Sequence, residues 1–346
     1  METKVSENKI VMEDAAQPAK RPSVSRLLTL LRILASGALV WFVLRKISAG
    51  ELLDLWIRTI DHWPYLVLAL AIPAIGVTVS ALRLRILLEA QGIRLPLIEL
   101  CKANLVGAFY NQIFPSTIGG DVARGFWISR LKAFVVEKTA PSESILVSFT
   151  AIGVDRIIGA FGILVTGLLA AIASPSIVRQ APGLGAVLPL VAAGIIALAL
   201  LPRIPARSAG RWLFSISILR KLREKAVMIY GALKAYRTCR RYLAVAFLLS
   251  MGLQLTIIAQ YWTLATALEI GVSLWALAIL IPIVTLISML PITINGIGLR
   301  ENALYVLGVS LGFNASSAVA LAWAFLVCKL FWAMPGALMH LQKRPR

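Results

Sequence analysis

Two short segments of this sequence combine helix-breaking residues with an arginine in the same order. Pro115–Arg124 (PSTIGGDVAR) and Pro291–Arg300 (PITINGIGLR) begin 176 residues apart and share five of ten positions, among them the proline, one glycine and the arginine. Proline removes a backbone donor and ends a helix, and glycine allows left-handed backbone. Such a segment can bind phosphate, because the amides at a helix start attract anions and arginine offers a two-pronged donor.

Each motif follows one apolar stretch and precedes another, so we interpret the pair as an internal duplication. Irregular backbone inside a bilayer must line a protein-enclosed or water-filled cavity, since lipid leaves peptide groups unsatisfied. Broken segments at matching positions of two halves indicate the binding site of a transporter. The alternative is two structural hairpins whose arginines extend to the membrane surface. In the first reading Arg124 and Arg300 hold the anion together, and Asp121 and Glu301 pair with them when no ligand is bound.

Further charges lie inside apolar blocks. Lys329 is far from either end of Ala315–Leu338, and Asp155 and Arg156 are adjacent within Ile145–Ala173. A charge at such depth is costly and normally faces a partner or a cavity. Adjacent opposite charges on one helix point in different directions, so each needs its own partner. The predicted substrate-binding residues are Asn111, Ser116, Gly119, Gly120, Asp121, Arg124, Asp155, Arg156, Asn295, Gly296, Arg300, Glu301 and Lys329.

No combination of residues in the sequence indicates a catalytic centre. Zinc-protease, serine-hydrolase and phosphate-loop motifs do not occur in it. Its three cysteines and two histidines are too far apart to suggest a disulfide framework or a metal site. We therefore expect no catalytic residue, no metal and no cofactor.

Long apolar blocks must position these residues. The chain is 59% hydrophobic and only 15% charged, with a mean hydropathy of +0.83, whereas an ordinary soluble domain is about 25% charged. This composition excludes a soluble enzyme and predicts an all-α fold, a polytopic integral membrane helical bundle of about 7–8 spans with two re-entrant-like segments. The predicted full spans are Leu27–Leu44, Trp63–Leu82, Ile145–Ala173, Leu184–Leu201, Leu243–Leu268, Leu274–Leu290 and Ala315–Leu338.

Charge divides the chain into a tail and a single transmembrane domain. Residues 1–26 are predicted to be a disordered cytoplasmic tail, and residues 27–341 the domain, whose halves 27–201 and 242–341 are joined by the basic segment 202–241. The positive-inside rule places that segment in the cytoplasm, either as a topology-determining loop or as a basic helix on anionic lipid. Arg83 and Arg85 are expected at the inner headgroup level. Seven spans would put the basic C-terminus outside, so the span count and the direction of the repeat stay open.

These residues resemble a known family, the transmembrane region of lysylphosphatidylglycerol synthase, which is the flippase-like module of the multiple peptide resistance factor. The resemblance rests on Leu82–Arg85, Asn111–Arg124, Asp155–Arg156 and Leu290–Glu301, and it extends over roughly residues 27–341. It implies a helical module that moves an anionic or glycosylated lipid between the leaflets of the cytoplasmic membrane. It does not imply lysyl transfer, which in the family belongs to a separate soluble domain that we do not expect in this chain.

Three classes of function remain open. The leading one is a lipid transporter whose partners are a membrane lipid and a lipid- or glycan-biosynthesis enzyme. The second is a membrane-embedded polyprenol- or lipid-dependent glycosyltransferase, for which Asp121 is the candidate acid. The third is a scaffold that recruits such an enzyme through residues 202–241. The net charge of +19 indicates an anionic lipid surface rather than nucleic acid, because no nucleic-acid-binding module is recognisable.

Overall fold

The computed structural model describes residues 22–45, 49–114, 118–131, 141–180, 236, 239–290 and 292–342. Within these ranges the chain forms helices and turns and has no strand, which confirms the predicted all-α membrane bundle. Four of the described helices are long and apolar enough to cross a membrane. They are α4 (Trp63–Glu89), α7 (Pro141–Ala173), α12 (Arg240–Ala267) and α15 (Ala315–Gln342).

A long helix, two short helices and a second long helix form a unit that occurs twice. The first unit consists of α4, α5 (Leu97–Ile113), α6 (Ile118–Ser129) and α7. The second consists of α12, α13 (Leu274–Ser288), α14 (Leu299–Ser310) and α15. Helix α4 packs along α12, α5 packs on α15, and α13 packs on α7. Each unit thus supports the first short helix of the other, as expected when two halves are related by a two-fold axis.

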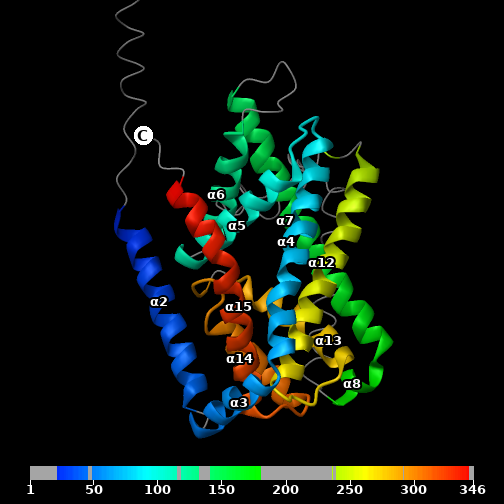
Figure 1. Cartoon of the computed structure of the whole chain (residues 1–346). Coiled ribbons are helices and arrows are strands. Elements are labelled where there is room, and N and C mark those ends of the chain that lie inside the picture. Colours follow the sequence, from blue (N-terminus) through cyan, green and yellow to red (C-terminus); the bar gives the residue numbers. More distant parts are fainter. Residues whose placement is uncertain are drawn as a thin grey trace, which may run out of the picture.

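The two units run in opposite directions, as Figure 1 shows. Helix α4 begins at the lower end beside α3 (Ala49–Asp61), whereas α12 begins at the upper end. The α5–α6 hairpin lies in the upper half of the bundle and the α13–α14 hairpin in the lower half. The duplication is therefore inverted, a relation that the sequence left open and that many transporter folds show.

Both hairpins turn where the sequence places proline and glycine. Helix α5 ends at Ile113, and the next residue, Phe114, is extended with φ −78° and ψ 141°, the conformation favoured before a proline. In the second hairpin Gly296 and Gly298 have φ of 77° and 85°, values that glycine adopts without a Cβ clash. Helix α13 has 15 residues and is about 22 Å long, less than the roughly 30 Å of a bilayer core. Leu274–Leu290, predicted as a full span, is instead the first arm of a hairpin.

Each unit contributes its own apolar core. In the first, buried side chains such as Leu84, Leu100 and Ile152 pack between α4, α5 and α7. In the second, Leu277, Leu304 and Leu321 do so between α13, α14 and α15. Helices within a bilayer associate mainly through such close packing and through hydrogen bonds, because lipid already surrounds exposed apolar side chains.

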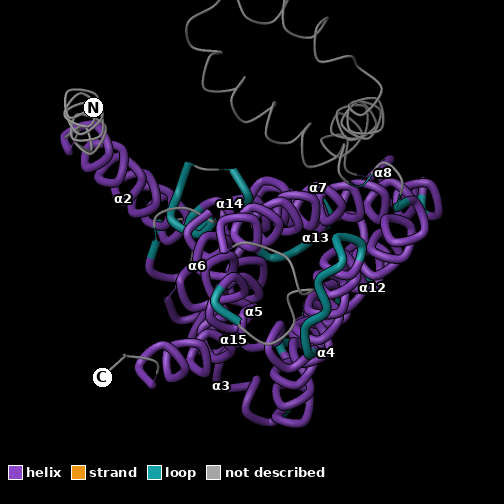
Figure 2. Tube along the Cα trace, turned by 90° about the horizontal axis from the view of Figure 1, so that it is seen from above, coloured by secondary structure: helices purple, strands orange, loops and turns teal. Residues whose placement is uncertain are grey.

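Helix α2 (Pro22–Leu44) lies outside the two units and packs on α14 at the edge of the bundle, as Figure 2 shows. The backbone N–H of Ile294 donates to Ser36 Oγ at 3.0 Å, and Asn302 Nδ2 donates to the Leu39 carbonyl at 2.9 Å. The start of α2 and the end of α15 lie at the same end of the bundle (Figure 1), which removes the difficulty that seven spans create for the basic C-terminus. The predicted span Leu184–Leu201, residues 1–21 and most of segment 202–241 lie outside the described residues.

Candidate functional site

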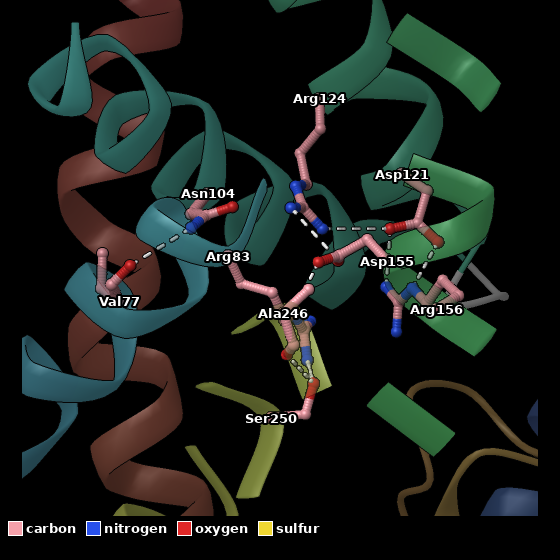
Figure 3. Close-up of polar contacts among 9 residues, drawn as sticks. All are labelled: Val77, Arg83, Asn104, Asp121, Arg124, Asp155, Arg156, Ala246 and Ser250. Carbon is pink, nitrogen blue, oxygen red and sulfur yellow. Dashed lines mark hydrogen bonds and ion pairs between the residues drawn. The ribbon is translucent and has the colours of Figure 1, made fainter. Parts of the chain in front are cut away.

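Five charged side chains from α4, α6 and α7 meet inside the first unit. We call Arg83, Asp121, Arg124, Asp155 and Arg156 the first polar cluster; Figure 3 shows it. Arg83 Nε donates to Asp155 Oδ1 at 2.6 Å. Arg156 Nε and Nη2 donate to the two oxygens of Asp121, each at 2.7 Å. Each acid is therefore paired with one arginine from another helix.

Arg124 lies between the two acids but is not bonded as closely as its neighbours. Its Nη1 is 3.5 Å from Asp121 Oδ1, and its Nη2 is 3.7 Å from Asp155 Oδ2. The residue is 7% exposed, and its buried Nε and Nη2 donate no hydrogen bond. Three arginines thus face two acids, and the first polar cluster carries one positive charge in excess.

The local sequence makes room for this cluster. Asp155 and Arg156 are consecutive on α7, so they point in different directions and reach Arg83 and Asp121 respectively. Gly107 on α5 lies against Arg124, where an added Cβ would come within 2.6 Å of Arg124 Cγ. Any larger residue at this position would displace the arginine, so the close approach of α5 and α6 requires the glycine.

A second set of polar residues surrounds the turn of the lower hairpin. We call Gln112, Asn295, Arg300, Glu301 and Lys329 the second polar cluster. Asn295 Oδ1 accepts from Lys329 Nζ at 3.4 Å, and Asn295 Nδ2 donates to Gln112 Oε1 at 2.5 Å. Arg300 Nη2 donates to the Asn295 carbonyl at 3.4 Å, while its buried Nη1 donates no hydrogen bond.

The second polar cluster also holds more basic than acidic side chains. Its single acid, Glu301, is 1% exposed and accepts a hydrogen bond from the Gly298 backbone N–H at 2.6 Å. Arg300 and Lys329 are its two basic side chains, and the Arg300 guanidinium lies 5.3 Å from the centre of the Phe325 ring. Through its hydrogen bonds to Gln112 and Lys329, the Asn295 side chain also links the α5–α6 hairpin to α15.

Two adjoining cavities extend between the clusters. One, of about 280 Å³, is lined by Arg124 and Arg156 together with residues of α4, α5 and α12. The other, of about 180 Å³, is lined by Gln112, Asn295 and Lys329. Both are also lined by Pro73, Ala108, Asn111 and Gln260. The cavities therefore meet at these shared residues, between the two broken segments.

The structure refines several expectations about individual residues. It places Arg124 and Arg300 in different clusters rather than around one anion. Asp121 lies beside Arg124 as expected, whereas Glu301 caps the start of its own helix instead of pairing with Arg300. The helix-start amides are also partly occupied, because the Gly120 N–H donates to Asn111 Oδ1 at 3.1 Å.

Of three further residues predicted to bind substrate, two shape the backbone of the hairpins and one lies outside the described residues. Gly119 packs directly beneath Phe114 at the turn of the upper hairpin. Gly296 provides left-handed backbone in the lower hairpin. Ser116 lies outside the described residues.

Arg83 is the main cluster residue that sequence reasoning misplaced. It was expected at the headgroup level, but it is 6% exposed, and it bonds Asp155 and, through Nη1, Ser250 Oγ at 2.8 Å. The sequence around Arg83 offered no signal for this burial, because its partners Asp155 and Ser250 lie 72 and 167 residues away in the chain. Within the described ranges no group of three or more His, Cys, Asp or Glu residues could hold a metal ion.

Comparison with known proteins agrees with this architecture. No curated protein and no solved structure matches the chain. A family model described as the lysylphosphatidylglycerol synthase TM region matches residues 29–336, a range that includes both hairpins and both polar clusters. The chain is thus a multi-pass membrane protein that belongs to the family of the lysylphosphatidylglycerol synthase TM region.

Proposed function

We propose that this protein moves an anionic or glycosylated lipid between the leaflets of the membrane, without catalysing a reaction on it. The observation that carries the proposal is the pair of adjoining cavities between two polar clusters in an inverted repeat. Inverted repeats with broken helices at the repeat interface are typical of transporters that expose one site to each side in turn.

The proposed path separates the two parts of a lipid. Its polar headgroup passes from the first polar cluster, past Asn111 and Gln260, to the second polar cluster. Its acyl chains stay in the bilayer, which the outer surface of α4 and α12 meets with exposed apolar side chains such as Val67 and Leu248. The polar residues then replace the water that the headgroup loses, which lowers the barrier to crossing.

Charge suggests which end of the molecule faces the cytoplasm. Figure 1 shows the ends of α4 and α6 and the start of α12 at the upper end of the bundle, and the exposed Arg94, Arg130, Arg240 and Arg241 follow or begin these helices in the sequence. The lower end holds α3, α8 and the ends of α2 and α12, whose exposed charges, among the side chains that the structure describes, are the acids Glu51, Asp54, Asp61 and Glu269 and the bases Arg45 and Arg179. Under the positive-inside rule the upper end, with both the start of α2 and the end of α15, faces the cytoplasm. We place the protein in the cytoplasmic membrane, where a lipid- or glycan-biosynthesis enzyme would supply or consume its cargo.

The geometry favours transport over glycosyl transfer. Asp121 is the candidate acid for catalysis, but both of its carboxylate oxygens accept hydrogen bonds from Arg156. A general base must also lie within hydrogen-bond reach of the proton that it abstracts, and Asp121 lines neither of the two cavities. The paired Asp121 therefore serves better as an anchor for Arg156 than as a catalytic group.

Leaflet exchange in liposomes tests the proposal. The purified protein is reconstituted with tail-labelled phospholipids, and the fraction of label reached by an external, membrane-impermeant quencher is followed over time. We expect the wild-type protein to make the inner-leaflet label accessible, and an Arg124→Ala/Arg300→Ala variant to lose this activity. Arg94→Ala, which removes an exposed charge outside both cavities, is the matched control. Wild-type exchange in the double variant would refute the proposed path.

A further inference from the structure

We infer that the cavity beside the first polar cluster selects a phosphodiester headgroup with one net negative charge and no ammonium group. This inference rests on the proposed function for its biological role, but it concerns binding and can be tested apart from transport. It narrows the cargo from anionic or glycosylated lipids to simple anionic phospholipids.

First, the three arginines of the first polar cluster differ in how many of their donors are hydrogen-bonded. Arg83 and Arg156 each make close hydrogen bonds to a carboxylate, at 2.6 and 2.7 Å. Arg124 makes only the longer ion pairs, and its Nε and Nη2 are buried without a hydrogen bond. Arg124 also lines the 280 Å³ cavity. It is therefore the arginine with donors to spare, and its side chain lines the larger cavity.

The second step is the charge that a ligand must bring. Buried donors that lack a partner, and a buried cation that is not fully balanced, both favour an anion over a neutral group. A sugar hydroxyl could accept a hydrogen bond from Arg124 but would leave the excess charge in place. The two free oxygens of a phosphodiester match the guanidinium fork and cancel one positive charge.

The third step concerns ammonium groups. The described residues that line the two cavities include Arg124, Arg156 and Lys329 but no aspartate or glutamate. The acids nearest to the larger cavity, Asp121 and Asp155, already accept from arginines. An ammonium group in either cavity would meet cations without a carboxylate to pair with, so zwitterionic and amine-bearing headgroups should be disfavoured.

Binding to the purified full chain in neutral detergent micelles tests this selectivity. Short-chain phosphatidylglycerol, phosphatidylcholine and phosphatidylethanolamine are titrated, and binding is followed by intrinsic fluorescence, for which Trp332 in the smaller cavity is a natural reporter. We expect phosphatidylglycerol to bind about tenfold more tightly than the other two, which corresponds to about 1.4 kcal/mol. Equal binding, or tighter binding of the amine-bearing lipid, would overturn the inference.

Variants link the preference to Arg124. We expect Arg124→Gln to remove the preference, Arg124→Lys to keep part of it because the charge stays but the fork is lost, and Arg94→Gln to leave it intact. Thermal unfolding of Arg124→Gln controls for folding, and since the change removes the excess cation we expect no loss of stability. A preference that survives in folded Arg124→Gln would refute the assignment.

Two further experiments distinguish a lipid ligand from a soluble headgroup, and binding from transport. Glycerophosphoglycerol, the same headgroup without acyl chains, should bind at least tenfold more weakly than the lipid. Equal binding would keep the phosphodiester site but replace the lipid by a soluble ligand. Selective binding without any leaflet exchange by the wild-type protein would refute transport and leave the inference standing.

Discussion

Replacing Asp155 by asparagine should destabilise the protein more than any other single change in the first polar cluster. Asp155 is 1% exposed, accepts a hydrogen bond from Arg83 at 2.6 Å and lies 3.7 Å from Arg124. Without it Arg83, Arg124 and Arg156, the first two of them buried, would face Asp121 alone, so the excess charge of the cluster would rise from one to two. Removal of one partner from a buried ion pair costs about 3–5 kcal/mol. We expect the apparent Tm in detergent to fall by on the order of 10 °C.

A double-mutant cycle separates this electrostatic effect from lost packing. In Arg83→Gln/Asp155→Asn the excess charge returns to one, so we expect the double variant to recover at least half of the Tm lost in Asp155→Asn. Both side chains are largely buried, at 8% and 1% exposure, so solvent should screen their interaction little. Thermal unfolding of the four proteins, followed by intrinsic fluorescence in one detergent, gives the coupling energy. A wild-type Tm for Asp155→Asn, or additive losses in the double variant, would refute the proposed charge balance.

Two further substitutions test the path on either side of its centre. Gly107→Ala should displace Arg124, because the new Cβ would lie 2.6 Å from Arg124 Cγ, and we expect leaflet exchange to fall at least tenfold. Gly252→Ala is the control: its new Cβ would have no neighbouring atom within 4 Å, so wild-type exchange should be retained. Lys329→Gln should keep the fold, since the hydrogen bond from Lys329 to Asn295 is 3.4 Å long, but it should slow the exchange of anionic lipid. Unchanged exchange rates in the liposome assay would remove Lys329 from the path.

Local sequence was sufficient to place the two broken segments. A proline restricts the residue before it, here Phe114, and Gly296 and Gly298 adopt left-handed backbone just before α14. The break after Ile113 and the turn into α14 therefore follow from these residue types. The need for separate partners of Asp155 and Arg156 also follows from helix geometry alone. The structure shows such partners in Arg83 and Asp121.

The sequence could not predict which side chains from distant helices pair with one another. Arg83 precedes Asp155 by 72 residues, and nothing near it in the chain distinguishes a buried arginine from one at the headgroup level. The same holds for Gln112 and Asn295, which are 183 residues apart and form the bond between the two hairpins. Apolar length likewise could not show that Leu274–Leu290 turns back, because a short spanning helix and a hairpin arm have the same composition.

Composition and periodicity by themselves determined the membrane bundle, the duplication and the list of costly buried charges, because bilayer thickness and the preferences of proline and glycine act locally along the chain. Only the tertiary structure decided the direction of the repeat, the pairing of the charges and the division of the two motif arginines between two clusters. Those features depend on which helices pack together. An excess of basic over acidic side chains in each cluster, with two adjoining cavities between the clusters, appears only when the helices are assembled.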